Sequence, residues 1–247
     1  MLGLPDSIRG CLFDLDGVLT QTATVHATAW KEMFDAFLEQ YAAATGDPFV
    51  AFDPVRDYGA YVDGMPRADG VRKLLASRGI GLPEGSPGDP PEAETVAGLG
   101  NRKNELVLKL IEERGVTVFD GSVRYVRAVR GAGLSAGVVS SSANTVSILE
   151  SAGLTELFDV RIDGVVAAER GLPGKPSPDT FLAGAEALGL EPEEAAVFED
   201  ALAGVEAGVA GGFGFVVGVD RIDQATALRE RGADIVVCDL AELLDGQ

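Results

Sequence analysis

Two aspartates of this chain, Asp14 and Asp16, stand directly behind a short apolar run that begins at Gly10. An aspartate carboxylate is a known nucleophile in phosphoryl transfer, and it carries the group as a covalent intermediate. A second carboxylate two residues further along can remove or return a proton at the same centre, so Asp16 is a candidate general acid and base. The pair therefore indicates phosphoryl transfer.

A second pair of carboxylates, Glu199 and Asp200, follows another apolar run. The site of an open α/β sheet lies beyond the carboxyl ends of its strands, so we expect this pair close to Asp14. A cluster of carboxylates repels an anionic phosphate. Mg²⁺ removes that repulsion and prefers oxygen ligands. The sequence therefore predicts a magnesium site made by Asp14 and Asp200, with Glu199 close by.

A lysine and a serine supply groups that bind phosphate. Lys175 lies in a Gly-Lys-Pro loop, and its ammonium group would bind a phosphate and offset the charge of the nucleophile. Ser140 ends an apolar run that a helical pattern follows. Its hydroxyl and the backbone N–H groups after it, from Ser141 on, would therefore lie at the positive end of a helix.

Each of these signals is weak when it is taken alone. A DxD triplet is more often a solvated turn, and Gly-Lys-Pro or a serine triplet is usually an ordinary loop. A Glu-Asp pair behind a strand can simply cap the next helix. Their joint occurrence, in this order and at the ends of separate strands, is much more specific.

The elements that must position these residues alternate between strand and helix patterns. The expected strands are 10–14, 134–140, 195–199, 213–219 and 234–238. The helices expected in the second half are 121–132, 143–152, 177–189, 201–210 and 223–231. This alternation predicts βαβ units and a parallel sheet. The expected fold class is α/β, with a doubly wound, Rossmann-like core.

The stretch between the first strand and Gly115 has no convincing strand pattern. Its expected helices are 24–44, 67–78 and 92–114, where apolar residues recur at helical spacing. Its expected loops, rich in Asp, Pro and Gly, are 45–66 and 81–92. We therefore expect a catalytic core from 1–19 and 116–247, with a helical cap domain inserted at 20–115.

Composition and charge exclude several classes of partner. Hydrophobic residues make up 46% of the 247 residues, which suits a soluble globular protein. The formal charge of −19 argues against nucleic acid and against an anionic membrane surface. No apolar run approaches membrane-spanning length, and the N-terminus lacks a signal-peptide pattern, so we expect a cytoplasmic protein. Cys11 and Cys238 lie in apolar runs and are expected to be buried, reduced thiols.

Four segments resemble the four motifs of the haloacid dehalogenase-like superfamily. They are FDLDGVLT (13–20), VVSSSAN (138–144), GKPSPDTF (174–181) and VFEDALAGVEAG (197–208). The resemblance implies that Asp14 is the nucleophile and that Asp16 is the acid and base. It also implies that Mg²⁺ is bound by Asp14, the Asp16 backbone carbonyl, Asp200 and Glu199. Ser140, Ser141 and Lys175 would bind the transferring phosphoryl group.

The inserted stretch narrows the resemblance. His26 and Trp30 lie four residues apart on an expected helix, hence on one face, and Arg67 follows a turn at Gly64. Together with Arg-Lys-Asn at 102–104, they resemble the β-phosphoglucomutase family of this superfamily. That family interconverts β-glucose 1-phosphate and glucose 6-phosphate through an aspartyl phosphate and a 1,6-bisphosphate.

This narrower resemblance implies roles for single residues. Thr22 would lie at the hinge of the cap, and His26 would help to position Asp16. Arg67 would bind the phosphate that is not transferred, and Lys103 would contact the sugar phosphate. The residues assigned to substrate binding are His26, Trp30, Arg67, Lys103 and Asn144. The resemblance further implies a monomer that acts on a small sugar phosphate.

Plainer interpretations stand beside these assignments. Taken singly, His26 would be a core or surface residue, Trp30 a core residue and Arg67 an ordinary helix start. Only the matched family pattern favours a functional role for His26 and Arg67 over these plain interpretations. The chain also departs from the family pattern, notably at Gln21 and Ala143, which leaves the sugar open.

Two other functions compete with a mutase. A magnesium-dependent sugar-phosphate phosphatase would use the same core residues with water as the acceptor, and fold alone does not separate the two. A non-enzymatic sensor on the same scaffold would be expected to lack Asp14 or Asp16, and both are present.

Overall fold

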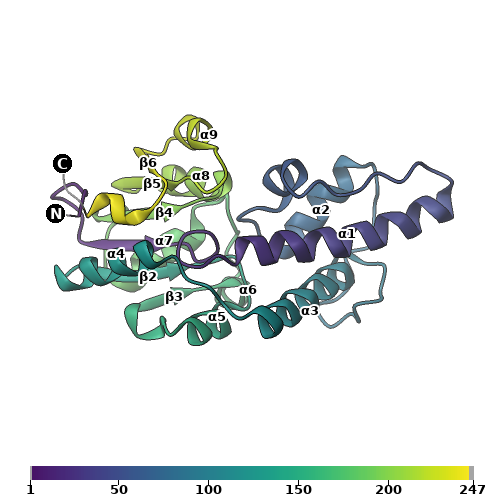
Figure 1. Cartoon of the computed structure of the whole chain (residues 1–247), viewed down its shortest axis with the longest axis horizontal. Helices are drawn as coiled ribbons and strands as arrows, with labels where there is room; N and C mark the ends of the chain where they lie inside the picture. The colour runs from purple at the N-terminus through teal and green to yellow at the C-terminus, as the bar shows by residue number, and fades with distance from the viewer. Residues whose placement is uncertain (1, 245–247) are drawn as a thin grey trace. The chain divides into compact units, whose positions relative to one another are not determined.

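The computed structural model describes residues 2–244, and this stretch divides into two compact units. Unit 1 takes the described residues up to Gln21 and those from Val116 onward. Unit 2 takes Thr22–Gly115 and is therefore an insertion in the sequence of unit 1. Figure 1 shows that strands are drawn only in unit 1, whereas unit 2 is helices and loops.

The chain leaves unit 1 and returns to it through one short antiparallel pairing. Thr20 forms an antiparallel bridge with Val118. The Gln21 N–H donates to the carbonyl of Thr117 at 2.9 Å. The outgoing and incoming segments are thus tied to each other inside unit 1, before the insertion begins.

The described residues of unit 1 form a six-stranded parallel sheet in the order β3-β2-β1-β4-β5-β6 (Figure 1). Its strands are β1 (Gly10–Phe13), β2 (Ser135–Val139), β3 (Val160–Ile162), β4 (Ala195–Glu199), β5 (Phe215–Val219) and β6 (Ile235–Val237). β1 lies in the interior of the sheet, with β2 on one side and β4 on the other. The sequence-based prediction of a doubly wound α/β fold is confirmed.

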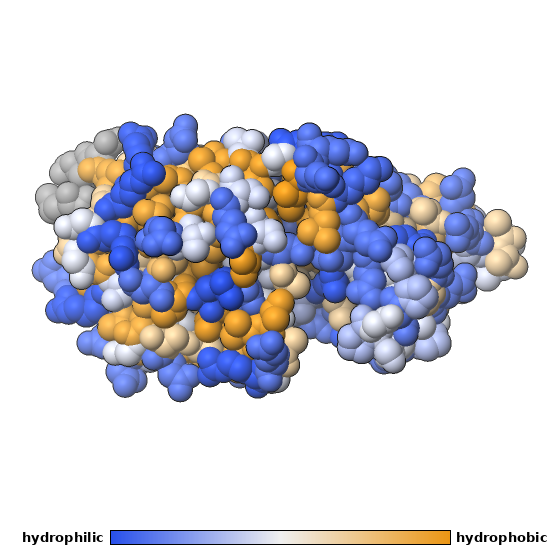
Figure 2. Space-filling view, turned by 90° about the horizontal axis from the view of Figure 1, so that it is seen from below, coloured by the Kyte–Doolittle hydropathy of each residue, from blue (hydrophilic) through white to orange (hydrophobic). Residues whose placement is uncertain are grey.

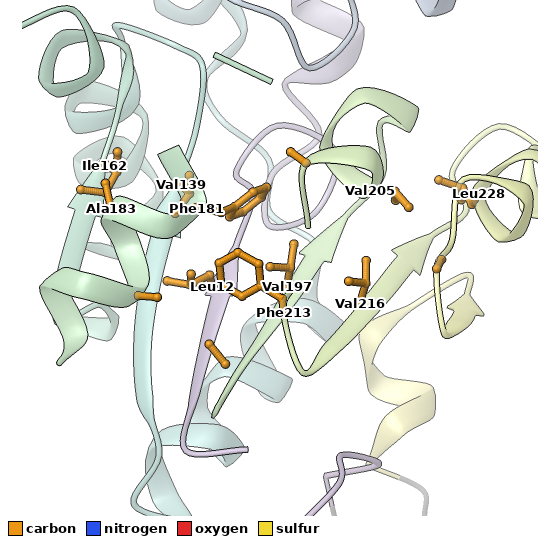
Figure 3. Close-up of a cluster of buried hydrophobic side chains, with 14 residues drawn as sticks. Leu12, Val139, Ile162, Phe181, Ala183, Val197, Val205, Phe213, Val216 and Leu228 are labelled. Carbon is orange, nitrogen blue, oxygen red and sulfur yellow. The ribbon is translucent and has the colours of Figure 1, made fainter. Parts of the chain in front are cut away.

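Helices pack on both faces of this sheet. They are α4 (Asp120–Gly131), α5 (Thr145–Ala152), α6 (Gly164–Arg170), α7 (Asp179–Leu188), α8 (Leu202–Ala210) and α9 (Ala225–Glu230). Successive strand residues point to opposite faces. Accordingly, Leu12 joins the buried cluster that contains Val197 and Phe181 of α7 (Figure 3), and Phe13 meets Tyr125 of α4 edge-on at 6.3 Å between ring centroids.

Two elements of unit 1 lie outside the sequence-based prediction. β3 has only three residues, at the edge of the sheet, and three residues carry too little periodicity to be recognised. α6 follows it directly, and the Asp163 carboxylate caps α6 by accepting hydrogen bonds from the N–H groups of Val165 and Val166.

Unit 2 consists of three α-helices and a π-helical turn. They are α1 (Ala23–Thr45), the turn Tyr58–Val62, α2 (Arg67–Ser77) and α3 (Val96–Arg114). An apolar face of α1 that includes Phe34 and Phe37 packs in one buried cluster with Leu74 of α2 and Leu99 of α3. The helix expected from residue 92 begins only at Val96, because Thr95 caps it.

The surface carries both hydrophilic and apolar residues. Hydrophilic residues occupy much of the face in Figure 2, with apolar residues between them. Among the described residues, no helix combines the length and the apolar character that crossing a membrane requires.

Cys11 is buried as expected, but Cys238 is exposed because it follows the end of edge strand β6. The expectation that both thiols are buried was therefore wrong for Cys238.

Candidate active site

The predicted carboxylates meet at one edge of the sheet because of strand register. β1 lies between β2 and β4, and Phe13 is aligned with Val138 on one side and Phe198 on the other. The next residue along β1, Asp14, therefore stands level with Glu199 at the end of β4. In a parallel sheet this carboxyl edge is where ligands bind.

A buried lysine joins these two carboxylates. The Lys175 ammonium donates to Asp14 Oδ1 at 2.6 Å and to Glu199 Oε1 at 2.7 Å. A third hydrogen bond reaches the carbonyl of Val139 at 3.2 Å, and the ammonium also lies 4.7 Å from the ring centroid of Phe181. All three donor positions of Lys175 are therefore used, so its place between β1, β2 and β4 is fixed.

Burial and charge act in opposite directions on these groups. Burial raises the pKa of Asp14, Lys175 lowers it, and the neighbouring carboxylates Glu199 and Asp16 add to the rise, so that it lies well above its usual range. Burial disfavours the charged form of Lys175, but Asp14 and Glu199 outweigh this and raise its pKa. The ammonium therefore stays charged, and the carboxylates around it exceed it in number.

The excess of negative charge fits a divalent cation. Carboxylate oxygens of Asp14, Glu199 and Asp200 lie within 4.8 Å of one another. Glu199 already accepts from Lys175 on Oε1 and from the Ala201 N–H on Oε2 at 2.8 Å. Asp14 and Asp200 are thus the residues that fit direct ligation, and Glu199 fits better as the partner of Lys175. An all-oxygen donor set of this kind suits Mg²⁺.

Two glycines make room for these carboxylates. A Cβ on Gly17 would lie 1.8 Å from Asp200 Oδ2, and the φ of +100° at Gly17 also disfavours other residues. A Cβ on Gly204, in α8, would lie 1.8 Å from Glu199 Oε1. Gly17 of the first motif and Gly204 of the fourth are therefore required for steric reasons, because a side chain at either position would overlap an acidic group.

The serine loop after β2 lies beside Asp16. Ser140 is buried, and its Oγ lies 3.4 Å from Asp16 Oδ2. The Ser142 N–H donates to Ser140 Oγ, and the Asn144 N–H donates to Ser142 Oγ, each at 3.1 Å. Two backbone donors after Ser140 are thus used inside the loop. The predicted phosphate-binding residues Ser140 and Ser141 thus lie directly behind the end of β2.

Three of the predicted substrate-binding residues gather inside unit 2. Lys103 of α3 lies with its ammonium 2.8 Å from His26 Nδ1 on α1, and 4.8 Å from the ring centroid of Trp30. An ammonium group has only donors, so Nδ1 of His26 is the acceptor that this contact requires. Trp30 is 3% exposed and stacks on Phe34, so it packs in the core and supports Lys103.

Arg67 lies apart from that trio, at the first position of α2. Its Nη2 donates to Asn101 Oδ1 of α3 at 3.3 Å. Thr22 is buried at the start of α1, where its carbonyl accepts from the His26 N–H at 2.9 Å. In unit 2, Thr22 is thus linked to His26, and the side-chain hydrogen bond of Arg67 goes to Asn101 rather than to His26, Trp30 or Lys103.

Sequence reasoning missed an arginine that braces the loop after Asp16. Arg221 donates to the carbonyls of Gly17 at 2.7 Å, Val18 at 3.3 Å and Cys238 at 2.6 Å. Its guanidinium carbon lies 3.6 Å from the ring centroid of Phe119. Its place in the sequence could have indicated it, because Arg221 is the second residue after β5 and therefore lies at the same sheet edge as the carboxylates.

Comparison with known proteins places this geometry in a family. The profile of the haloacid dehalogenase-like hydrolases matches residues 8–212. The chain belongs to that family. It is also 58% identical to a β-phosphoglucomutase of Mycobacterium bovis over 247 residues, which covers 99% of this chain and 94% of the relative. Identity to the Bacillus subtilis β-phosphoglucomutase is 30%, over 96% of this chain and 92% of the relative.

A solved structure agrees with the fold of this haloacid dehalogenase-like hydrolase. The crystal structure of a β-phosphoglucomutase from Clostridium difficile matches with a TM-score of 0.73 at 26% identity. The match covers 96% of this chain and 93% of that chain. The likeness therefore extends over both units as well as the sheet that carries Asp14.

Asp200→Asn tests the metal site. A ligand that binds only the folded state stabilises it, by about 2.7 kcal/mol at a hundredfold excess over Kd. We expect Mg²⁺ to raise the thermal unfolding midpoint of the wild-type enzyme and to do so much less for Asp200→Asn. Glu193→Gln, an exposed carboxylate of the same unit, serves as the control and should behave like wild type. An equal rise in all three proteins would contradict the assignment.

Arg221→Lys tests the brace on the loop after Asp16. Lysine keeps the charge but loses the planar set of donors that reaches several carbonyls at once. We expect the free energy of unfolding to fall by about 1–3 kcal/mol in urea titrations, and turnover of p-nitrophenyl phosphate to fall with it. The control is Arg124→Lys on α4, which is exposed. Unchanged turnover in Arg221→Lys would show that the loop does not need this residue.

Proposed function

We propose that this chain is a β-phosphoglucomutase that interconverts β-D-glucose 1-phosphate and glucose 6-phosphate. The observation that carries the proposal is the 58% identity to mycobacterial β-phosphoglucomutases, because it runs through unit 2 as well as unit 1. A core site alone would suit any phosphotransferase or phosphatase of the family. With this function we expect a cytoplasmic monomer that acts on a small sugar phosphate and on neither nucleic acid nor membrane.

Asp14 is the nucleophile in this proposal, and its hydrogen bonds select the attacking atom. Lys175 occupies Oδ1, whereas Oδ2 accepts no hydrogen bond from the described part of the chain. Oδ2 attacks phosphorus, the bond from phosphorus to the leaving oxygen breaks, and the aspartyl phosphate forms. The Ser140 hydroxyl binds the transferring group, and the buried Lys175 ammonium beside Asp14 offsets its negative charge. Mg²⁺, held by Asp14, the Asp16 carbonyl and Asp200, would offset its negative charge.

Asp16 moves the proton in both half-reactions. When a phosphoryl group is transferred to Asp14, Asp16 gives its proton to the oxygen of the leaving sugar. When the 6-hydroxyl of β-glucose 1-phosphate attacks the aspartyl phosphate, Asp16 takes the hydroxyl proton, and glucose 1,6-bisphosphate forms. The bisphosphate then returns its 1-phosphoryl group to Asp14, and glucose 6-phosphate leaves. Asp16 is partly exposed, in contrast to buried Asp14, which suits a group that exchanges protons with a substrate.

Unit 2 supplies the substrate contacts in this proposal. Arg67 binds the phosphate that is not transferred, and Lys103 contacts the sugar phosphate. His26, held by Lys103, helps to position Asp16 as the proton carrier, and Trp30 supports Lys103 from the core. Thr22 lies where unit 2 begins and would serve as the hinge. Asn144 of unit 1 completes the phosphate side.

Product analysis tests the function. The wild-type enzyme, given Mg²⁺, β-glucose 1-phosphate and a trace of glucose 1,6-bisphosphate, should form glucose 6-phosphate with little free phosphate. Asp14→Asn should abolish turnover, because an amide cannot take up the phosphoryl group. Free phosphate as the main wild-type product would identify a sugar-phosphate phosphatase instead. Full activity in Asp14→Asn would exclude the covalent mechanism.

Arg67→Ala tests the role of the second phosphate site. Removing the guanidinium should raise the KM for glucose 1,6-bisphosphate by roughly tenfold or more, since a charge-assisted contact to phosphate is lost. Hydrolysis of p-nitrophenyl phosphate, which has one phosphate, should change little. Arg72→Ala is the matched control on the same helix, because Arg72 is exposed and paired with acidic residues. Equal losses with both substrates would count against the assignment.

A further inference from the structure

The guanidinium of Arg67 has a neutral partner in a strongly acidic protein. The chain carries 39 Asp and Glu against 20 Lys and Arg. Within residues 2–244, however, Arg67 makes no ion pair, and its side-chain hydrogen bond goes to the amide oxygen of Asn101 at 3.3 Å. Arg72, five residues further along α2, instead pairs with Asp69 and Glu84. Arg67 is half-buried, and burial lowers the pKa of its guanidinium.

The orientation of the Asn101 amide is fixed by its other end. Its Nδ2 group donates to the carbonyl of Pro87 at 3.0 Å and to the carbonyl of Asp89 at 2.8 Å. Both protons of the amide nitrogen are therefore used, and only the oxygen is left to face Arg67. An aspartate could not make these two contacts, because an ionised carboxylate has no donor.

The loop that supplies these two carbonyls is itself tied to the start of α3. The Thr95 hydroxyl donates to Asp89 Oδ2 at 2.7 Å and accepts from the Gly98 N–H at 2.9 Å. The Val96 N–H donates to the carbonyl of Pro83 at 2.9 Å. The loop expected at 81–92 is present and largely exposed, and these hydrogen bonds tie it to the start of α3.

We propose that Asn101 is a positioning residue that fixes the guanidinium of Arg67 while leaving its positive charge unneutralised for the second phosphate of a bisphosphorylated sugar. This inference rests on the proposed substrate class. A carboxylate at position 101 would compete with the phosphate for the same guanidinium, because both are anions that arginine binds through paired N–H groups. An amide of the same shape orients Arg67 but does not compete.

The test uses Asn101→Asp, Asn101→Ala and the control Gln40→Glu in the full-length enzyme. Asn101→Asp keeps the shape and an oxygen for Arg67, loses the two N–H donations to Pro87 and Asp89, and adds a charge. Asn101→Ala loses all three hydrogen bonds and adds no charge. Gln40→Glu adds an equal charge at an exposed position of α1. Each variant is assayed with glucose 1,6-bisphosphate and with p-nitrophenyl phosphate. In a mutase and in a phosphatase alike, Asp14 takes a phosphoryl group from the bisphosphate, and water then hydrolyses the aspartyl phosphate and releases phosphate. The comparison therefore does not require the mutase reaction.

For the bisphosphate, Asn101→Asp should raise KM by roughly tenfold, whereas kcat stays within about twofold of wild type. Asn101→Ala should raise KM less, and Gln40→Glu should match wild type. With p-nitrophenyl phosphate all four proteins should agree. An unchanged KM in Asn101→Asp, an equal rise in Asn101→Ala, or equal losses on both substrates would overturn the inference. Free phosphate as the main wild-type product from β-glucose 1-phosphate would instead overturn the mutase function and leave this comparison valid.

Discussion

The buried ammonium of Lys175 is the contact on which the site of unit 1 depends. It binds Asp14 and Glu199 at once, so carboxylates that would repel one another can share the carboxyl edge of the sheet. One cation for several carboxylates still leaves an excess of negative charge. That excess suits a divalent cation, and both oxygens of Glu199 already accept hydrogen bonds from Lys175 and the Ala201 N–H.

The rest of unit 1 meets the steric demands of this cluster. β1 must lie between β2 and β4 for Asp14 to stand level with Glu199. Gly17 and Gly204 must lack side chains for the acidic groups to fit. Unit 2 uses charge differently, because there a neutral amide orients an arginine. Unit 1 thus concentrates negative charge around one lysine, whereas unit 2 holds a guanidinium that has an amide as its partner.

Sequence alone predicted the fold and the meeting of the strand-end residues at one sheet edge, because both follow from local patterns. The alternation of apolar runs and helices gave the parallel sheet, and residues at strand ends gave Asp14, Ser140 and the Glu199–Asp200 pair. β3 was missed because it has only three residues. The prediction that Cys238 is buried was wrong because β6 ends before this residue. The contacts of Arg221 and Asn101 join segments far apart in the chain, and spacing carries no information about such pairs.

The paired segments at Thr20 and Val118 have a consequence for how such an enzyme can change over time. They close the loop of chain at its base, inside unit 1, so the length and content of what lies between them are not constrained by the sheet. Duplication, loss or replacement of the insertion would leave the nucleophile and its lysine undisturbed. An ancestral enzyme could in this way acquire new substrates by exchanging the insertion, while it kept the residues that carry out the reaction.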